Sequence, residues 1–183
     1  AHAGVGGPRV SPQPAPAPAP DGDACSRARA LAFSHLVGRR SATQVVRTPS
    51  GFAVLHRGFP DSTAHNRVVV TGAADPAATL ALADRVLGGA RLPHRHVAVD
   101  HDRIDRGWED AFAAVGYAHG RLVLMAARSQ PGRPAEAVVE RLPYHQLAAT
   151  VAAGWRRTLP DASEAVVQEL VARRAATAAA CTV

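Results

Sequence analysis

Lysine is absent from this sequence of 183 residues, cysteine occurs only twice, and aromatic residues make up 4%. Cys25 and Cys181 lie near opposite ends of the chain and form no Cys-x-x-Cys pair, which excludes a disulfide framework and favours a reducing compartment. No apolar run approaches the roughly 18 residues that a membrane helix needs. No charged-then-apolar leader opens the sequence. We therefore expect a cytoplasmic protein without a membrane span.

The basic charge is the next feature to weigh, because a net charge of +6 suggests nucleic-acid binding. All 21 basic residues are arginine, and alanine, glycine and proline are also abundant, which indicates a compositional bias acting on every position. The arginines are spread along the chain, and no basic face is interleaved with aromatic residues. We therefore do not expect direct binding to nucleic acid.

The chain divides by composition into a tail and a globular part. Residues 1–22 contain the run SPQPAPAPAP, which favours extended polyproline II structure and cannot build a core, so we expect a disordered tail. Apolar residues form 47% of the whole chain, enough for a core built largely from alanine and valine. The Pro/Gly-rich stretch RSQPGRPAE then predicts a boundary. We expect one unit over 23–130 and the start of another over 131–183.

The globular part shows alternating helix and strand signals. A first helix is expected from residue 24, with Asp23 as its N-cap and Gly38 as its stop. A helix over 75–89 carries Asp75 as cap, Pro76 at its first position and a Gly88-Gly89 terminator. Further helices are predicted over 107–117, 144–157 and 161–180, and strands over 43–48, 51–57, 67–72, 94–100, 121–127 and 137–142. This order implies an α/β fold with helices packed on a mixed sheet.

Several of these elements carry finer expectations. The strands 43–48 and 51–57 should form a hairpin, and Gly116 should close the helix 107–117. Asp161 and Glu164 have capping-box spacing for the last helix. Trp108 and Trp155, the largest apolar side chains, should anchor their helices to the sheet.

This element order, together with LPHRHVAVD and AFAAVGYAHGRLVLMA, resembles the GNAT superfamily of acyl-CoA-dependent N-acetyltransferases. In that family a late helix ends Leu-Tyr-x-x-x-Gly-Phe before a strand, and residues 111–117 stand in the matching positions. Residues 24–130 look like the first half of actinobacterial proteins with two GNAT-like units, and 136–183 look like the opening of the second. The resemblance implies a mixed, mostly antiparallel sheet. It also implies a parent activity that transfers an acetyl group from acetyl-CoA to an amine.

Two departures from the family pattern bear on activity. The family binds the coenzyme pyrophosphate on a strand-to-helix loop, whereas the literal match here, RVLGGA over 85–90, falls at the end of a predicted helix, where the dipole is negative. The family's general-acid tyrosine corresponds to Phe112, which has no proton to give, and Tyr117 stands where the family places a packing phenylalanine. We expect this chain to bind acetyl-CoA weakly or not at all. A catalytic unit would then have to follow Val183.

The remaining alternatives are a docking module and a metal site. The C-terminal helices are rich in small residues, so we consider a homodimer, a second GNAT-like unit or another partner docked there. The stretch RLPHRHVAVDHD raises a metal role, but a single strand places only His94 and His96 close enough to share an ion. We therefore expect no metal there, with His101 and Asp102 in the loop beyond Asp100.

Other polar residues have an ordinary structural explanation. Asp61, Ser62 and Asn66 in FPDSTAHN could face a ligand, but turn chemistry selects the same residue types and is the favoured interpretation. His35 and His145 are single histidines on predicted helices, where exposure or partial burial explains each without a function. The sequence therefore assigns no catalytic, cofactor-binding or metal-binding residue.

Overall fold

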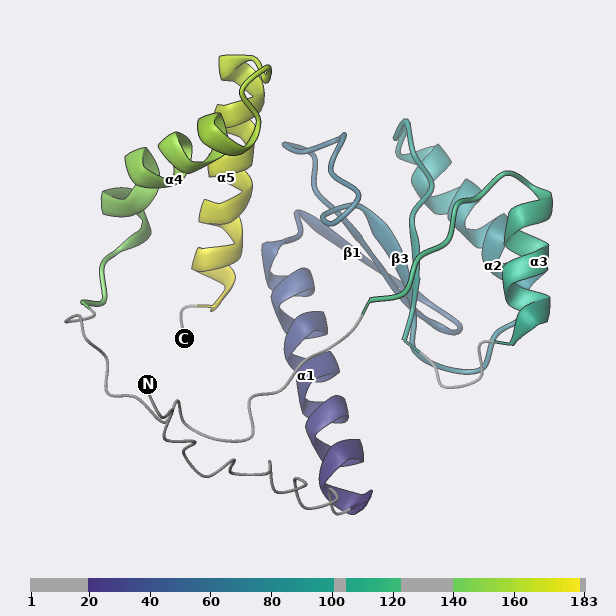
Figure 1. Ribbon diagram of the computed structural model, residues 1–183. Coiled ribbons are helices and arrows are strands. Elements are labelled where there is room, and N and C mark those ends of the chain that lie inside the picture. The colour runs from purple at the N-terminus through teal and green to yellow at the C-terminus, as the bar shows by residue number, and fades with distance from the viewer. Residues whose placement is uncertain (1–19, 101–104, 123–139, 182–183) are drawn as a thin grey trace, which may run out of the picture.

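A computed structural model describes residues 20–100, 105–122 and 140–181. Four strands form one sheet in the order β1-β2-β3-β4, and helices lie on its faces and beside it (Figure 1). The fold is therefore the mixed α/β fold expected from the sequence. The elements are α1 (Pro20–Ser41), β1 (Gln44–Thr48), β2 (Gly51–Leu55), β3 (Arg67–Val70), α2 (Pro76–Ala83), the π-helical turn η1 (Asp84–Gly88), β4 (Val97–Val99), α3 (Arg106–Ala114), α4 (Tyr144–Thr158) and α5 (Glu164–Cys181).

The sheet combines an antiparallel hairpin with a parallel crossover. Strands β1, β2 and β3 run antiparallel to their neighbours, whereas β4 lies parallel to β3 after the α2 crossover. Val68 stands opposite Val97 and Val70 opposite Val99. The predicted hairpin and the mostly antiparallel character of the sheet are confirmed.

The two faces of β3 are both buried, which explains its continuous apolar sequence. Val68 and Val70 face the larger core, where Leu82 and Leu87 of the α2–η1 segment pack on the sheet. Trp108 of α3 packs against that core and so anchors its helix as expected. Val69 faces the other side, in a small cluster with Phe52, Val54, Ala42 and Ala98.

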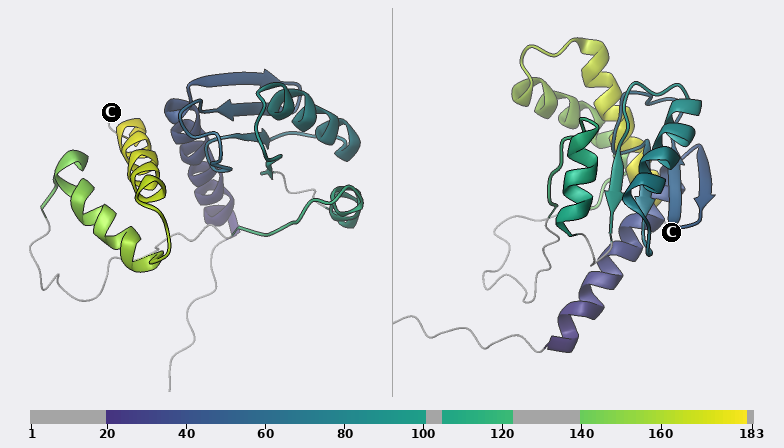
Figure 2. Two further views of the ribbon diagram at one scale, coloured as in Figure 1. Left: turned by 90° about the horizontal axis from the view of Figure 1, so that it is seen from above. Right: turned by 90° about the vertical axis from the view of Figure 1, so that its right-hand side faces the viewer.

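Helix α1 covers this second face and connects it to the C-terminal helices. The His35 ring packs edge-on against Phe52 with centroids 5.4 Å apart, and the Arg39 guanidinium lies 4.9 Å from the same ring. Helix α5 packs against α1 and α4 packs against α5. The order α4, α5, α1, sheet is visible both in Figure 1 and from above in Figure 2.

The start and end of α1 differ from the sequence expectation. The helix already begins at Pro20, so Asp23 lies inside it and is not its N-cap, and residues 20–22 are not tail. The helix also continues through Gly38 to Ser41. A Cβ at Gly38 would lie 3.7 Å from the Arg67 guanidinium, an ordinary van der Waals distance, so the Arg67 side chain reaches α1 at this glycine. The remaining tail expectation concerns residues 1–19, which lie outside the described residues.

The caps of the later helices are partly as expected. Asp75 caps α2, its Oδ1 accepting from the Ala78 amide at 2.8 Å, with Pro76 in the first helical position. Gly116 follows α3 with φ +86°, the left-handed conformation expected of a helix stop. The capping box predicted for α5 from Asp161 and Glu164 is wrong. Ser163 Oγ accepts from the Val166 amide, and the Glu164 carboxylate binds Arg156 instead.

Two predicted strands and one predicted anchor are not borne out in the described residues. Arg121 and Leu122, at the start of the strand predicted over 121–127, are not in a strand, nor are residues 140–142. The rest of both segments lies outside the described residues. Trp155 lies in a groove between α4 and α5, so it does not anchor α4 to the sheet. The helix pair is held to the body through α5 and α1 instead.

Candidate functional site

The two histidines before β4 brace the loop between β2 and β3. His94 Nε2 donates to the Asn66 carbonyl oxygen at 3.1 Å, and His96 Nδ1 donates to the Thr63 carbonyl oxygen at 2.8 Å. Because a carbonyl oxygen can only accept, these ring nitrogens carry the protons. Among the residues that the structure describes, no three His, Cys, Asp or Glu side chains gather as a metal ion requires. His101 and Asp102 lie outside those residues.

Asp100 separates from the two histidines and pairs with helix α1. Its Oδ2 lies 2.5 Å from Nε2 of His35, so the histidine expected to serve packing also fastens α1 to the end of β4. Arg67 lies on the same face, and burial lowers its pKa while Asp100 raises it. Its Nε is buried without a hydrogen-bond partner in the described part of the chain. His35, Asp100 and Arg67 therefore form a polar contact between α1 and the sheet.

The loop between β2 and β3 is organised around one buried amide. Asn66 Oδ1 accepts from the His56 amide at 2.7 Å, and its Nδ2 donates to the carbonyl oxygens of Phe59 and Ser62 at 2.6 and 3.0 Å. Ser62 Oγ lies 2.9 Å from Nδ1 of His65. Ser62 is only 3% exposed, so this serine-histidine contact cannot reach a substrate. The turn-chemistry interpretation is thus confirmed for Ser62 and Asn66, while Asp61 is exposed in the same loop.

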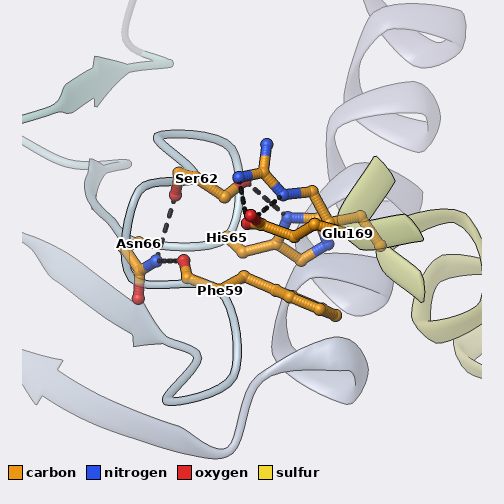
Figure 3. A network of polar contacts seen from close by, with 6 residues as sticks. Phe59, Ser62, His65, Asn66 and Glu169 are labelled. Atoms are coloured by element: carbon orange, nitrogen blue, oxygen red, sulfur yellow. Dashed lines mark hydrogen bonds and ion pairs between the residues drawn. The ribbon is translucent and has the colours of Figure 1, made fainter. Parts of the chain in front are cut away.

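The same loop supports the C-terminal helix. In Figure 3 His65 points toward the Glu169–Arg173 ion pair of α5, so the loop and the helix are in contact there. Burial lowers the pKa of His65, and the positive charges of His56, Arg173 and Arg67 lower it further. Burial also lowers the pKa of His56, whose ring stacks on Phe59 at 4.0 Å. Both shifts favour the uncharged form of the ring.

Acid is expected to destabilise this contact between loop and helix. The folded pKa of His65 lies below its ordinary value of 6.5, so the unfolded chain takes up this proton more readily. Its contribution to stability is present above pH 6.5 and is lost as the pH falls through the lowered folded pKa. We expect the urea midpoint to fall between pH 7.5 and 5.5, and to fall less steeply in His65→Gln. An unchanged slope in that variant would contradict the assignment, and the exposed His145→Gln serves as control.

The RVLGGA segment has no amide groups free to bind an anion. The Gly89 amide donates to carbonyl oxygens of Arg85 and Val86, and the Ala90 amide donates to Val86. Both glycines remain helical, and the left-handed residue is Arg91 with φ +57°. The flexible end of the Arg95 side chain lies against Gly88, 2.7 Å from where a Cβ would be. The segment is the packed end of a helix, as the sequence indicated.

In the strand-to-helix loop between β3 and α2, the groups that could bind an anion already have partners within the protein. The amides of Thr71 and Gly72 both donate to the Ser50 carbonyl oxygen, at 2.9 and 3.1 Å. The Asp75 carboxylate sits at the N-terminus of α2, where an anion would otherwise be favoured. An incoming phosphate would meet bonded amides and a negative charge at this place.

An open groove lies at the other end of the molecule, between α4 and α5. It has a volume of about 580 Å³ and is lined by Tyr144, Val151, Gly154, Trp155, Arg157, Thr158, Arg174, Thr177 and Ala178. The sequence suggested a docked partner on these helices but no small-molecule site between them. The signal was present, since Tyr144, Val151, Trp155 and Thr158 recur at the spacing of one helix face.

Comparisons with protein-family models, curated proteins and solved structures find no significant match to this chain. None of the helices in the described ranges combines the length and apolar character needed to cross a membrane. Function therefore has to be inferred from the loop, the helix caps and the groove described above.

Proposed function

We propose that this chain is a GNAT-like unit that does not itself transfer acetyl groups. The observation that supports this most is the Asp75 carboxylate on the N-terminus of α2, in the strand-to-helix loop after β3. A coenzyme pyrophosphate needs free amides and a positive helix end. Here the carboxylate takes the helix end, and the amides of Thr71 and Gly72 are bonded to Ser50.

The residues in the family's general-acid region support the same proposal. Phe112 stacks on Trp108 with ring centroids 5.7 Å apart and contacts the Tyr117 ring at 5.1 Å, so it serves packing. The Tyr117 hydroxyl oxygen is buried, and burial raises the pKa of that phenol. A hydroxyl that is enclosed and slow to release its proton is poorly suited to protonate a departing thiolate.

Calorimetry with acetyl-CoA tests this proposal. We expect no binding, or a dissociation constant weaker than about 1 mM, for two reasons: the Asp75 carboxylate takes the helix end, and the amides of Thr71 and Gly72 are bonded to Ser50. Asp75→Ser, which keeps a capping oxygen without the charge, should leave the result unchanged because Thr71 and Gly72 remain bonded. Micromolar affinity with one site per chain would overturn the proposal.

A second candidate function is docking of a second copy of this chain through its C-terminal helices. Four of its large apolar side chains that are more than a third exposed belong to this region, namely Leu142, Leu147, Leu159 and Val166. Light scattering after size exclusion separates the candidates, because a stable dimer supports docking and a monomer at 100 μM counts against it. The free, exposed Cys25 and Cys181 are compatible with the cytoplasmic location that we propose.

A further inference from the structure

We propose that the groove between α4 and α5 binds a small organic anion, in which a carboxylate or phosphate is carried on a flat apolar body. This inference does not depend on the GNAT resemblance or on the absence of transferase activity. It rests on the size of the groove, on two arginines without acidic partners and on two aromatic side chains beside them.

The groove has the dimensions of a small-molecule site. Its volume of about 580 Å³ falls within the range of roughly 300–1,000 Å³ that such sites occupy. Helices α4 and α5 pack against each other, and each has a buried residue, Ala152 in α4 and Val167 in α5. Gly154 leaves the groove open, because a Cβ at that position would have only the Arg157 guanidinium within 4 Å. Glycine in a helix interior costs roughly 0.5–1 kcal/mol relative to alanine, so it is an unfavourable choice for helix formation alone.

The arginines of α4 and α5 fall into two groups, those paired with a glutamate and those without an acidic partner. Arg156 binds Glu164 through two hydrogen bonds of 2.8 and 3.1 Å, and Arg173 pairs with Glu169 on the same helix. Arg157 and Arg174, which line the groove, form no hydrogen bond or ion pair with any residue in the described ranges. Two guanidinium groups with their donors free suit a carboxylate or phosphate, which both accept in a bidentate manner.

The aromatic side chains of the groove, Tyr144 and Trp155, would contact the apolar part of the ligand. The Tyr144 hydroxyl donates to the Val171 carbonyl oxygen at 2.8 Å, which fixes the ring against α5. Trp155 is partly exposed on the same groove. Aromatic rings stack favourably on flat apolar groups, and a nearby arginine adds to such contacts. A flat body bearing an anion therefore matches both halves of the lining.

The first experiment is calorimetry of the full chain with 2-naphthyl phosphate, 2-naphthoate, 2-naphthol and inorganic phosphate. We expect one site per chain with a micromolar dissociation constant for at least one of the two naphthyl anions, and comparing them distinguishes phosphate from carboxylate. The neutral naphthol and the bare phosphate should each bind at least about tenfold more weakly, because each offers only half of the matching chemistry. Equal binding of either one, or no binding of both naphthyl anions at 1 mM, would overturn the proposal.

Variants of the groove residues test whether the anion binds in the groove. The double variant Arg157→Gln with Arg174→Gln should weaken the anion at least about tenfold and leave naphthol binding unchanged. Arg85→Gln, at an exposed position on η1, is the matched control and should have no effect. Gly154→Leu should fill the groove and abolish binding while circular dichroism shows the helices intact. Full affinity in the double variant or in a folded Gly154→Leu protein would contradict the assignment.

Discussion

Asn66→Asp is expected to lower the free energy of unfolding by at least about 3 kcal/mol, measured by urea denaturation at pH 7.5. Asn66 is 1% exposed, and its amide nitrogen donates to the carbonyl oxygens of Phe59 and Ser62. An aspartate keeps the acceptor for the His56 amide but places a buried charge against two carbonyl oxygens. The variant therefore loses the two hydrogen bonds to Phe59 and Ser62, and its carboxylate is repelled by the same two carbonyl oxygens.

The neighbouring Asp61 provides the matched control. It lies exposed in the same loop, so Asp61→Asn should change stability by less than about 0.5 kcal/mol. Asn66→Ala should also destabilise the protein, because it leaves the His56 amide and two carbonyl oxygens without their partner. A stability of Asn66→Asp within 1 kcal/mol of the parent protein would show that the loop is not organised around this amide.

Gly51→Ala is the second change with a large expected effect. A Cβ at Gly51 would lie 2.1 Å from the Val69 carbonyl oxygen, inside the β2–β3 pairing. The obstructing atom belongs to the backbone of a buried strand and cannot rotate away, so the strands would have to separate. We expect a loss of about 3 kcal/mol or more, seen as a lower urea midpoint or as failure to fold.

Gly72→Ala tests whether this effect is specific to the strand pairing. Gly72 follows β3 and its amide bonds to Ser50, the residue before Gly51, and a Cβ at Gly72 would come no closer than 3.9 Å to the Ser50 carbonyl oxygen. That distance is ordinary van der Waals contact, so we expect little change in stability. If both variants lost the same stability, the close approach at Gly51 would not be the cause.

The sequence predicted most strongly the elements whose signals are local. The hairpin of β1 and β2, the strand β3 and the Asp75–Pro76 start of α2 all follow from alternation, apolar runs or capping chemistry within a few residues. The last two helices were also predicted within a few residues of their observed bounds. Their N-terminal details were less accurate, since Ser163 and not Asp161 caps α5.

Glycine was interpreted less accurately, because its role depends on what approaches it in space. Gly38 was taken as a helix stop, yet α1 continues past it and the Arg67 guanidinium lies close by. Gly88 stands at a helix end as predicted, and the Arg95 side chain from a later segment lies against it. No periodicity in the sequence brings Arg67 beneath Gly38 or Arg95 beside Gly88.

The sequence by itself determined the fold class, the mixed sheet and the separation of the histidine stretch into two ends of a strand. Period and capping signals within a few residues fix the type and order of the elements, and that order implies the fold class and the mixed sheet. Only the tertiary structure decided that His94 and His96 bind the loop of Asn66, that Asp100 pairs with His35, and that α4 and α5 enclose a groove. The partners in each case come from distant segments, so their meeting depends on packing that local sequence patterns do not encode.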